Sequence, residues 1–329
     1  MKPSDARALA GAHSEVVHFA NDQAALQPWI EMQCYQLGRG DTLARIDHLD
    51  LDAAHLFRET QTATVQKLGV MPAKLCTISV CTPDPTFRFS ELSASTSDAV
   101  FFMPGGTEFD IYVPAGACTS YISLDQEQLL RNAHAIAPAA WERTPDQLTM
   151  ISTSGRPVFS HLISQILNQA ARLTTAHEPL DKPALHMAIM QGIQMIIASG
   201  SEAMEAEPER ARALHVCRKA RAFIDEQLAM DSVPTIADIC QATDVSERTL
   251  QYAFRRYVDM TPLIYLRMCR LNQVRAALRH LDPSSTTVTT VAVRYGFIHL
   301  GRFSADYKNA FAELPSETLS RCGNRIAAP

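Results

Sequence analysis

The feature that most constrains this chain is a helical segment that occurs twice near its C-terminal end. The first copy reads VSERTLQYAFRRYVDMTPLI from Val245, and the second reads IHLGRFSADYKNAFAELPSE from Ile298. Apolar, basic and proline residues recur 53 positions apart in Leu250 and Phe303, Phe254 and Tyr307, Arg255 and Lys308, Val258 and Phe311, and Pro262 and Pro315. Because a duplicated unit implies a duplicated task, the repeat predicts two equivalent structural units.

Each copy has the pattern of the second helix of a helix-turn-helix. A short helical pattern precedes each one, IADICQAT (236–243) in the first case and TTVTTVAVRYGF (286–297) in the second. We expect Ser246 to cap the first of these second helices. Gly296 is expected to adopt a positive φ in the turn of the second copy, which is one residue longer. In a helix-turn-helix the second helix lies in the major groove, so both copies are candidate DNA readers.

The spacing of the two copies fits the geometry of DNA. Thr261 and Pro262 open a predicted helix, PLIYLRMCRLNQVRAALRHL, that ends before Asp282-Pro283. Its roughly 20 residues span about 30 Å, close to the ~34 Å between successive major-groove faces on one side of B-DNA. One chain could thus place two recognition helices in adjacent grooves.

The outward face of the first recognition helix carries groups that suit DNA. Arg248 and Gln251 lie near its start, where Arg can pair with guanine and Gln with adenine. Arg255 and Arg256 follow and are placed for phosphates, which position a protein without specifying sequence. The alternative is an ordinary solvated helix face. We would favour that alternative for one isolated copy, but not for two copies at a fixed spacing.

Residues before about 200 have a different character. Short strand patterns separated by turn residues occupy 72–124, including a tight turn at Pro104-Gly105-Gly106, and helical patterns follow at 156–174 and 182–199. The small, acidic stretch 199–210 is predicted to be a linker. The net charge of −5 is the sum of +6 for residues 210–329 and −11 for residues 1–209. The positive charge of the C-terminal part favours a nucleic-acid partner for it. We therefore predict a multidomain α+β protein, with residues 1–200 for sensing and dimerisation and 210–325 for DNA binding.

Several other classes of protein are disfavoured by motifs that the sequence lacks. It has no apolar leader and no apolar run long enough to span a bilayer, and its eight cysteines form no CxxC pair. We therefore expect a cytoplasmic chain that has reduced thiols and no membrane partner. It also has no HxH, GxSxG, P-loop or GxGxxG motif, which predicts a protein that is not an enzyme and needs neither a metal nor a cofactor.

One strand pattern offers a candidate ligand site. In EFDIYV, Glu108, Asp110 and Tyr112 point to one side of the strand, while Phe109, Ile111 and Val113 point to the other. With the nearby aromatic residues Phe87, Phe89, Phe101 and Phe102, the first set could bind a small amine through charge and cation–π contacts. The alternative is a satisfied strand face over an aromatic core, which is the commoner arrangement.

The segment from about 235 to 322 resembles the AraC/XylS family of bacterial transcription regulators. The similarity lies in IADICQATDVSERTLQYAFRRYVDMTPLIYLRMCRLNQVRAAL and in VTTVAVRYGFIHLGRFSADYKNAFAELPSETL. It implies a cupin-like sensing domain, promoter DNA and RNA polymerase as partners, and a homodimer formed through 156–199. By position, it implies base-reading roles for Arg248, Gln251 and Tyr252 in the first copy, and for Leu300, Gly301, Ser304 and Ala305 in the second. His299, Arg302 and Lys308 would anchor the second helix, whose outward face has few base-reading groups.

Three stretches are similar to the ethanolamine-utilisation operon regulators within this family. They are HLGRFSADYKNAFAELPSETL, PGGTEFDIYVP and LFRETQTATVQKLG. This resemblance implies an activator of a catabolic operon, with ethanolamine and adenosylcobalamin as effectors. Two alternatives stay open. One is an AraC-type regulator of virulence, stress or secondary metabolism with another effector, and the other is a small-molecule-binding protein that does not bind DNA.

Overall fold

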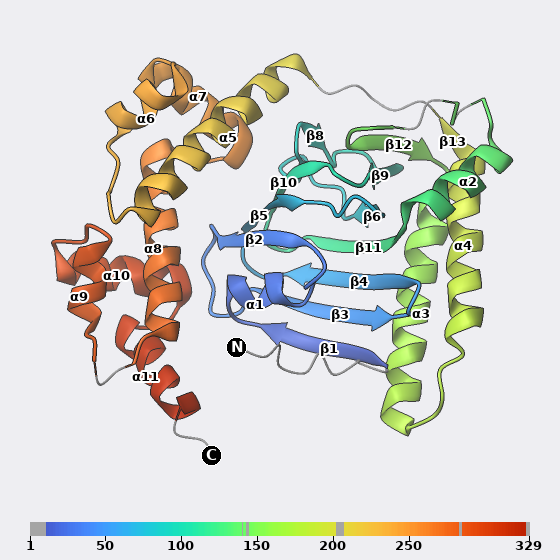
Figure 1. The fold of residues 1–329 in the computed structure, drawn as a ribbon, viewed down its shortest axis with the longest axis horizontal. Coiled ribbons are helices and arrows are strands. Elements are labelled where there is room, and N and C mark those ends of the chain that lie inside the picture. The colour runs from blue at the N-terminus through green and yellow to red at the C-terminus, as the bar shows by residue number, and fades with distance from the viewer. Residues whose placement is uncertain (1–10, 140, 143–144, 202–206, 283–284, 327–329) are drawn as a thin grey trace.

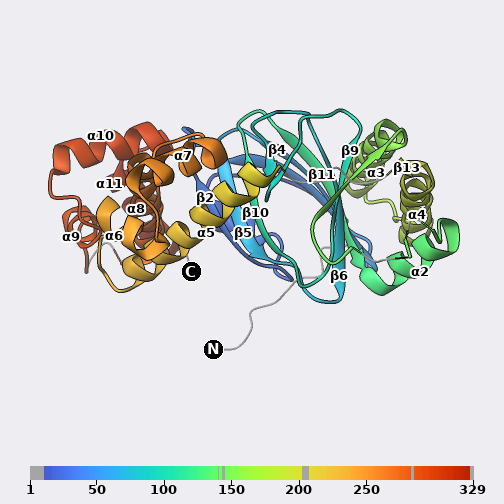
Figure 2. The same cartoon turned by 90° about the horizontal axis from the view of Figure 1, so that it is seen from above.

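A β-rich N-terminal domain lies between two groups of helices (Figures 1 and 2). The structure, a computed structural model, describes residues 11–139, 141–142, 145–201, 207–282 and 285–326. On one side of the sheets lie α2 (Gln126–Ile136), α3 (Arg156–Ala176) and α4 (Lys182–Ser199). On the opposite side lie the C-terminal helices, α5 (Pro208–Ala229), α6 (Ile236–Thr243), α7 (Glu247–Val258), α8 (Pro262–His280), α9 (Val288–Arg294), α10 (Leu300–Phe311) and α11 (Pro315–Ile326).

Two antiparallel sheets form the N-terminal domain. The larger has the order β1-β3-β4-β11-β6-β9-β12-β13, made of Ala12–Val17, Ala44–Asp50, Ala54–Gln61, Cys118–Asp125, Leu75–Cys81, Ala99–Met103, Thr149–Thr153 and Gly200–Ser201. The smaller has the order β2-β5-β10-β7-β8, made of Glu31–Gln36, Val65–Val70, Glu108–Val113, Arg88–Phe89 and Leu92–Ser93. A short helix, α1 (Ala20–Ala25), connects β1 to β2.

The two sheets enclose an apolar core. Phe89, Phe101 and Phe109 are buried in it, and the rings of Phe89 and Phe101 stack with centroids 4.2 Å apart. The opposite face of the large sheet packs against α3 and α4 through a second core that includes Leu56, Ile122 and Ile163. This arrangement confirms the predicted β-rich N-terminal domain with helices, and the all-α C-terminal domain.

The predicted strands of 72–124 are present, and so is the tight turn, where Gly106 has a φ of +77°. The alternation along β10 is also confirmed, since Phe109 and Val113 enter the core between the sheets while Tyr112 packs in the opposite direction. The strands before residue 70 were not predicted. Their inward positions include His48, Glu59, Gln61 and Lys67, so these strands lack the apolar alternation that marks a half-buried strand.

The helices follow the predicted start and stop signals. Pro157 lies in the first turn of α3, and Pro183 lies in the first turn of α4. The Thr261 side chain caps α8 by accepting a hydrogen bond from the backbone N–H of Ile264 at 3.3 Å. The predicted linker 199–210 is shorter in the structure, because α4 continues to Ser199 and α5 begins at Pro208. Residues 202–206 of that linker, and residues 1–10 of the predicted sensing domain, lie outside the described residues.

Membrane-spanning helices and clustered metal ligands are both absent from the described residues. Within 11–326, apart from the gaps given above, no helix has the length and hydropathy needed to cross a membrane. Over the same residues, no group of three or more His, Cys, Asp or Glu side chains has a geometry that could hold a metal ion.

Candidate DNA-binding interface and effector cavity

The first helix-turn-helix is formed by α6 and α7. A capping box at Thr235 and Asp238 starts α6, and Asp244 ends it in the left-handed conformation with a φ of +55°. The Ser246 hydroxyl accepts a hydrogen bond from the backbone N–H of Thr249 at 3.2 Å, which confirms the predicted N-cap of α7. The apolar stripe of α7 is buried, as Leu250, Ala253, Phe254, Tyr257 and Val258 show. The opposite face of α7 therefore points outward.

The second helix-turn-helix is formed by α9 and α10. Gly296 in its turn has a φ of +76°, as predicted. The backbone N–H of Phe297 then bonds the carbonyl of Ala292 at 2.9 Å, which closes the end of α9. A series of ring contacts, tilted in the first pair and edge-on in the next two, holds α10 to its domain with centroids 4.8 to 5.7 Å apart. The rings belong to Phe297, Phe303, Tyr307 and Phe311. These aromatic contacts fix α10, so its outward face is presented rigidly.

The predicted DNA-binding residues lie on the outward faces of both helices. On α7 the side chains of Arg248, Gln251, Tyr252, Arg255 and Arg256 are exposed. In the second unit His299, Leu300, Gly301, Arg302, Ala305 and Lys308 are exposed, and Ser304 is half-buried. The two helices lie toward one edge of the domain, and α6 and α9 lie toward the other (Figure 2). Between them, α8 has 19 residues, a length of about 28 Å.

Several of these side chains already have partners within the chain. The Tyr252 hydroxyl donates to Glu209 at 3.2 Å, and the guanidinium of Arg256 donates to Glu207 at 2.9 Å. Both acidic residues lie at the start of α5, which packs along α7. The Gln251 amide donates to Glu247 at 3.1 Å, one turn earlier on the same helix. The contacts from α5 therefore cover part of the face of α7 that is suited to DNA.

The predicted ligand face on β10 is part of the contact between the two domains. Asp110 is 1% exposed, and its carboxylate accepts hydrogen bonds from Gln66 at 2.8 and 3.0 Å. Tyr112 is buried among residues of the C-terminal core, and Glu108 alone of the three is exposed. Burial raises the pKa of Asp110 to about 6. The interpretation of Glu108, Asp110 and Tyr112 as an open ligand site needs correction, because Asp110 and Tyr112 are covered by the helical domain.

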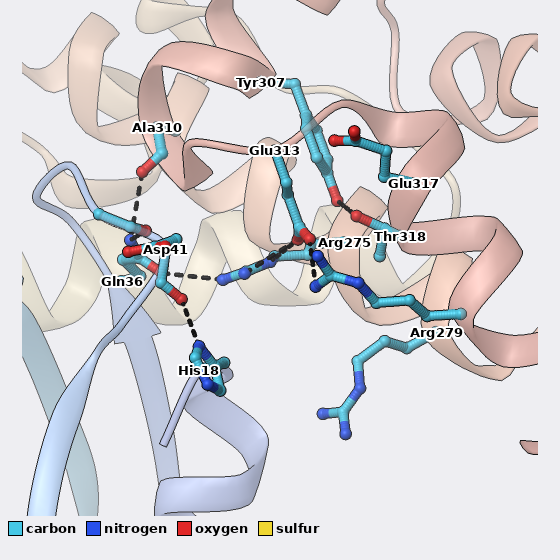
Figure 3. Close-up of polar contacts among 12 residues, drawn as sticks. His18, Gln36, Asp41, Arg275, Arg279, Tyr307, Ala310, Glu313, Glu317 and Thr318 are labelled. Atoms are coloured by element: carbon cyan, nitrogen blue, oxygen red, sulfur yellow. Dashed lines mark hydrogen bonds and ion pairs between the residues drawn. The ribbon is translucent and has the colours of Figure 1, made fainter. Parts of the chain in front are cut away.

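A polar network joins the N-terminal domain to the C-terminal helices (Figure 3). Arg275 of α8 donates to the side chain of Gln36 in β2 at 2.9 Å and pairs with Glu313 at 2.9 Å. The amide of Gln36 in turn donates to the carbonyl of Ala310 at 3.2 Å. Arg279 forms a two-point ion pair with Asp22 at 2.9 Å. These contacts, together with the buried rings of Tyr35 and Tyr112 in the helical core, hold the domains in one arrangement.

A second candidate site is a narrow cavity between the two sheets. It measures about 50 Å³ and is lined by Met32, Met71, Phe87, Phe89 and Phe109, with Lys67 and Tyr121 among its polar groups. Room for one water takes about 10–15 Å³, so the cavity holds about four water-sized groups. Of the four phenylalanines expected near a ligand, Phe87 and Phe89 therefore line this cavity, whereas Phe101 and Phe102 are not among its lining residues. The strand face predicted with them points away from it.

Behind this cavity is a buried carboxylate. Glu59 is 3% exposed, accepts a hydrogen bond from the Tyr121 hydroxyl at 2.6 Å, and forms an ion pair with Lys67. The amide of Gln23 donates to it at 3.0 Å. Burial and the charge of Glu59 raise the pKa of Tyr121 well above its ordinary value. Glu59 and Lys67 were not predicted as site residues. Once 56–69 is known to form two strands, the alternation of side chains places both residues on the buried side, and opposite charges there indicate an ion pair.

Comparison with protein families identifies a helix-turn-helix domain over residues 239–321. The XylDLEGF operon transcriptional activator of Pseudomonas putida is 37% identical over 106 residues, which is 32% of each chain. The probable thc operon regulatory protein of Rhodococcus erythropolis is 40% identical over 85 residues, which is 26% of each chain. The chain thus spans about a third or less of the length of these two curated relatives.

Solved structures give a weaker likeness over more of the chain. The AraC-like transcriptional activator CuxR is 14% identical with a TM-score of 0.40, over 80% of this chain and 94% of that one. ToxT of Vibrio cholerae is 8% identical with a TM-score of 0.30, over 89% of this chain and 98% of that one.

Proposed function

We propose that this chain is a promoter-binding transcription regulator of the AraC/XylS type that responds to a small molecule. The observation that carries the proposal is the outward exposure of two helix-turn-helix recognition faces on one edge of a single domain (Figure 2). The α8 length of about 28 Å supports their use in successive major grooves. The relatives that match residues of this domain are named operon activators and regulators.

Within this proposal the two helices have unequal tasks. Arg248, Gln251 and Tyr252 would read bases, because an exposed Arg and Gln near a helix start can form bidentate pairs. Arg255, Arg256, Arg302, Lys308 and His299 would position the protein on phosphates. In the second unit Leu300, Gly301, Ser304 and Ala305 offer little beyond contacts with thymine methyl groups. We therefore expect the first unit to carry more of the sequence specificity.

The effector would bind in the cavity between the sheets. Its volume suits a molecule of about four non-hydrogen atoms, which supports ethanolamine over a cobalamin as the occupant. Glu59 could receive the ammonium group of such a ligand in place of Lys67, since a buried carboxylate needs a positive or hydrogen-bonding partner. Control of a catabolic operon is part of the same proposal, and RNA polymerase would be the partner through which activation occurs.

We also propose that the protein acts as a homodimer through α3 and α4. Val158, Met187 and Met195 are large apolar side chains exposed on these two helices. Exposed apolar groups gathered on one face mark an interaction surface when they are contiguous. Two dimer-related chains would present four recognition helices to tandem half-sites.

The test is selection of binding sites from a random duplex library, followed by affinity measurements at fixed salt. The proposal expects enrichment of a bipartite sequence whose two parts lie about one helical turn apart. Failure to enrich any duplex would favour the second candidate function, a small-molecule-binding protein without DNA binding. Thermal-shift screening with small amines then tests the effector, because a ligand that binds the folded state raises the unfolding temperature.

A further inference from the structure

A single carboxylate lies between two arginines at the start of α5. Glu207 Oε2 pairs with Nη2 of Arg210, one turn along α5, at 3.2 Å, and with Nη2 of Arg256 on α7 at 2.9 Å. The Glu207 side chain is 57% exposed, whereas that of Arg210 is only 14% exposed. One carboxylate oxygen thus contacts two guanidinium groups that come from different helices, and its single negative charge is shared between them.

More positive charge surrounds this point than Glu207 can balance. Arg88 of β7 lies close enough that, after burial, the charges of Arg210 and Arg256 contribute to lowering its pKa. Among the described residues, the Nε atoms of both Arg88 and Arg210 are buried without a hydrogen-bond partner. Guanidinium groups with unused N–H donors are suited to an anion that has more acceptor oxygens than a carboxylate has.

The position of the two arginines points to the identity of that anion. Arg256 follows Tyr252 by one turn on the outward face of α7, beside Arg255 and beyond the base-reading position of Arg248. On a recognition helix whose start enters the major groove, basic residues nearer the end meet the sugar-phosphate backbone. Arg pairs with phosphate through the same two-point geometry that it uses for carboxylate.

We propose that Arg210 and Arg256 form a binding site for a backbone phosphate of promoter DNA, which Glu207 occupies in the DNA-free protein. The inference rests on the proposed function. Glu207 acts as a built-in competitor, so DNA must displace it before Arg256 can contact the backbone. Glu209 does the same for Tyr252, whose hydroxyl it holds at 3.2 Å.

The experiment compares Glu207→Gln with Glu226→Gln in the full-length chain. Each replacement removes one negative charge from an exposed side chain, at the N-cap of α5 for Glu207 and within α5 for Glu226. Neither changes the size of the side chain greatly. At about 0.15 M salt a charge far from the duplex is screened over roughly 8 Å. We expect E207Q to tighten binding to the selected duplex roughly three- to fivefold, the size of one exposed ion pair, and E226Q to change it less than about 1.5-fold.

A double-mutant cycle then assigns the effect to Arg256. In an Arg256→Ala background, E207Q should give no gain beyond that of E226Q, because the competition has lost its target. In a parallel pair, Arg210→Ala should reduce the slope of log affinity against log salt by about one, as expected for one lost phosphate contact. Arg212→Ala, an exposed arginine on the same helix, should leave that slope unchanged.

The outcomes separate the two proposals. Equal affinities of E207Q and E226Q for the selected duplex, or a gain that persists in the Arg256→Ala background, would overturn the phosphate site and leave the proposed function intact. No binding of any duplex by the unaltered chain would overturn both proposals. A selective gain for E207Q that disappears with Arg256 establishes the site.

Discussion

The Tyr257 hydroxyl, near the end of α7, donates a hydrogen bond to the backbone carbonyl of Asp110 in β10 at 2.9 Å. The two residues are 147 positions apart in the chain. Both are buried, so the bond fixes α7 directly to β10. A change in the N-terminal domain can therefore reach α7 through this contact.

Replacing Tyr257 by Phe should lower the free energy of unfolding by about 1 kcal/mol, because the carbonyl of Asp110 loses a buried partner. Chemical denaturation measures the change. Tyr252→Phe makes the same substitution at an exposed position of the same helix, where we expect less than about 0.5 kcal/mol. Equal effects of the two variants would argue that the contact between Tyr257 and Asp110 does not stabilise the folded protein.

The buried carboxyl of Asp110 should make stability depend on pH. Burial raises its pKa from an ordinary 3.8 to about 6, so the folded state binds a proton more readily than the unfolded state does. The contribution of this group to the free energy of unfolding is then fully present below about pH 4. It falls by up to about 3 kcal/mol as the pH rises through 6. Asp110→Asn removes the charge, so its advantage over the unaltered chain should appear above pH 6 and shrink toward pH 4. A constant difference at pH 4, 5, 6 and 7 would contradict this.

Replacing Arg248 by Ala should weaken specific binding by about 1–3 kcal/mol and relax the preference at one base position. Site selection with the variant, followed by competition between matched and single-base-changed duplexes, measures both effects. Arg212→Ala is the control, since it removes one exposed Arg from α5. An unchanged consensus for R248A would remove Arg248 from the base-reading set.

Lys308 on α10 should behave differently from Arg248. Its replacement by Ala is expected to weaken binding to all duplexes alike and to reduce the salt slope by about one, because a lost phosphate contact carries no sequence information. Affinities for the selected and a scrambled duplex at several salt concentrations test this. Loss confined to the selected duplex would instead place Lys308 among the base-reading residues.

Replacing Met187 by Glu should dissociate the proposed dimer, because it puts a charge into an apolar contact between α4 helices. Met187 is 63% exposed and Met230, in the helical domain, is 64% exposed. Met230→Glu is therefore the matched control, and we expect it to leave the oligomeric state unchanged. Light scattering at several protein concentrations measures the mass, and a monomeric unaltered chain would end the dimer proposal.

The helical domain could be predicted closely from the sequence, because its signals are local. Ser246, Thr261 and Gly296 adopt the capping and turn conformations expected of them. The apolar stripe of α7 is determined by helical periodicity alone. The predicted outward residues are therefore exposed, apart from the half-buried Ser304, and their contacts with DNA stay predictions.

The N-terminal domain was predicted less completely, because its inward positions are not uniformly apolar. Glu59 and Lys67 are buried as an ion pair contributed by two strands, and neither residue signals its burial locally. The alternation along β10 agrees with the prediction, but two residues of the face that was expected to bind a ligand, Asp110 and Tyr112, are buried. The phenylalanine side faces the cavity, and the side with Asp110 and Tyr112 faces the helices.

The sequence alone determined the two helix-turn-helix units, their spacing and the outward placement of Arg248 and Gln251, since these depend on residues within a turn or two of each other. Only the tertiary structure decided which charges meet. Arg275 donates a hydrogen bond to Gln36, which lies 239 residues away in the chain. Arg256 of α7 donates a hydrogen bond to Glu207, at the start of α5. Such pairs depend on how whole helices and strands pack. The sequence around each charged residue does not distinguish among its many possible partners, whereas the packing brings only one or two of them within contact distance.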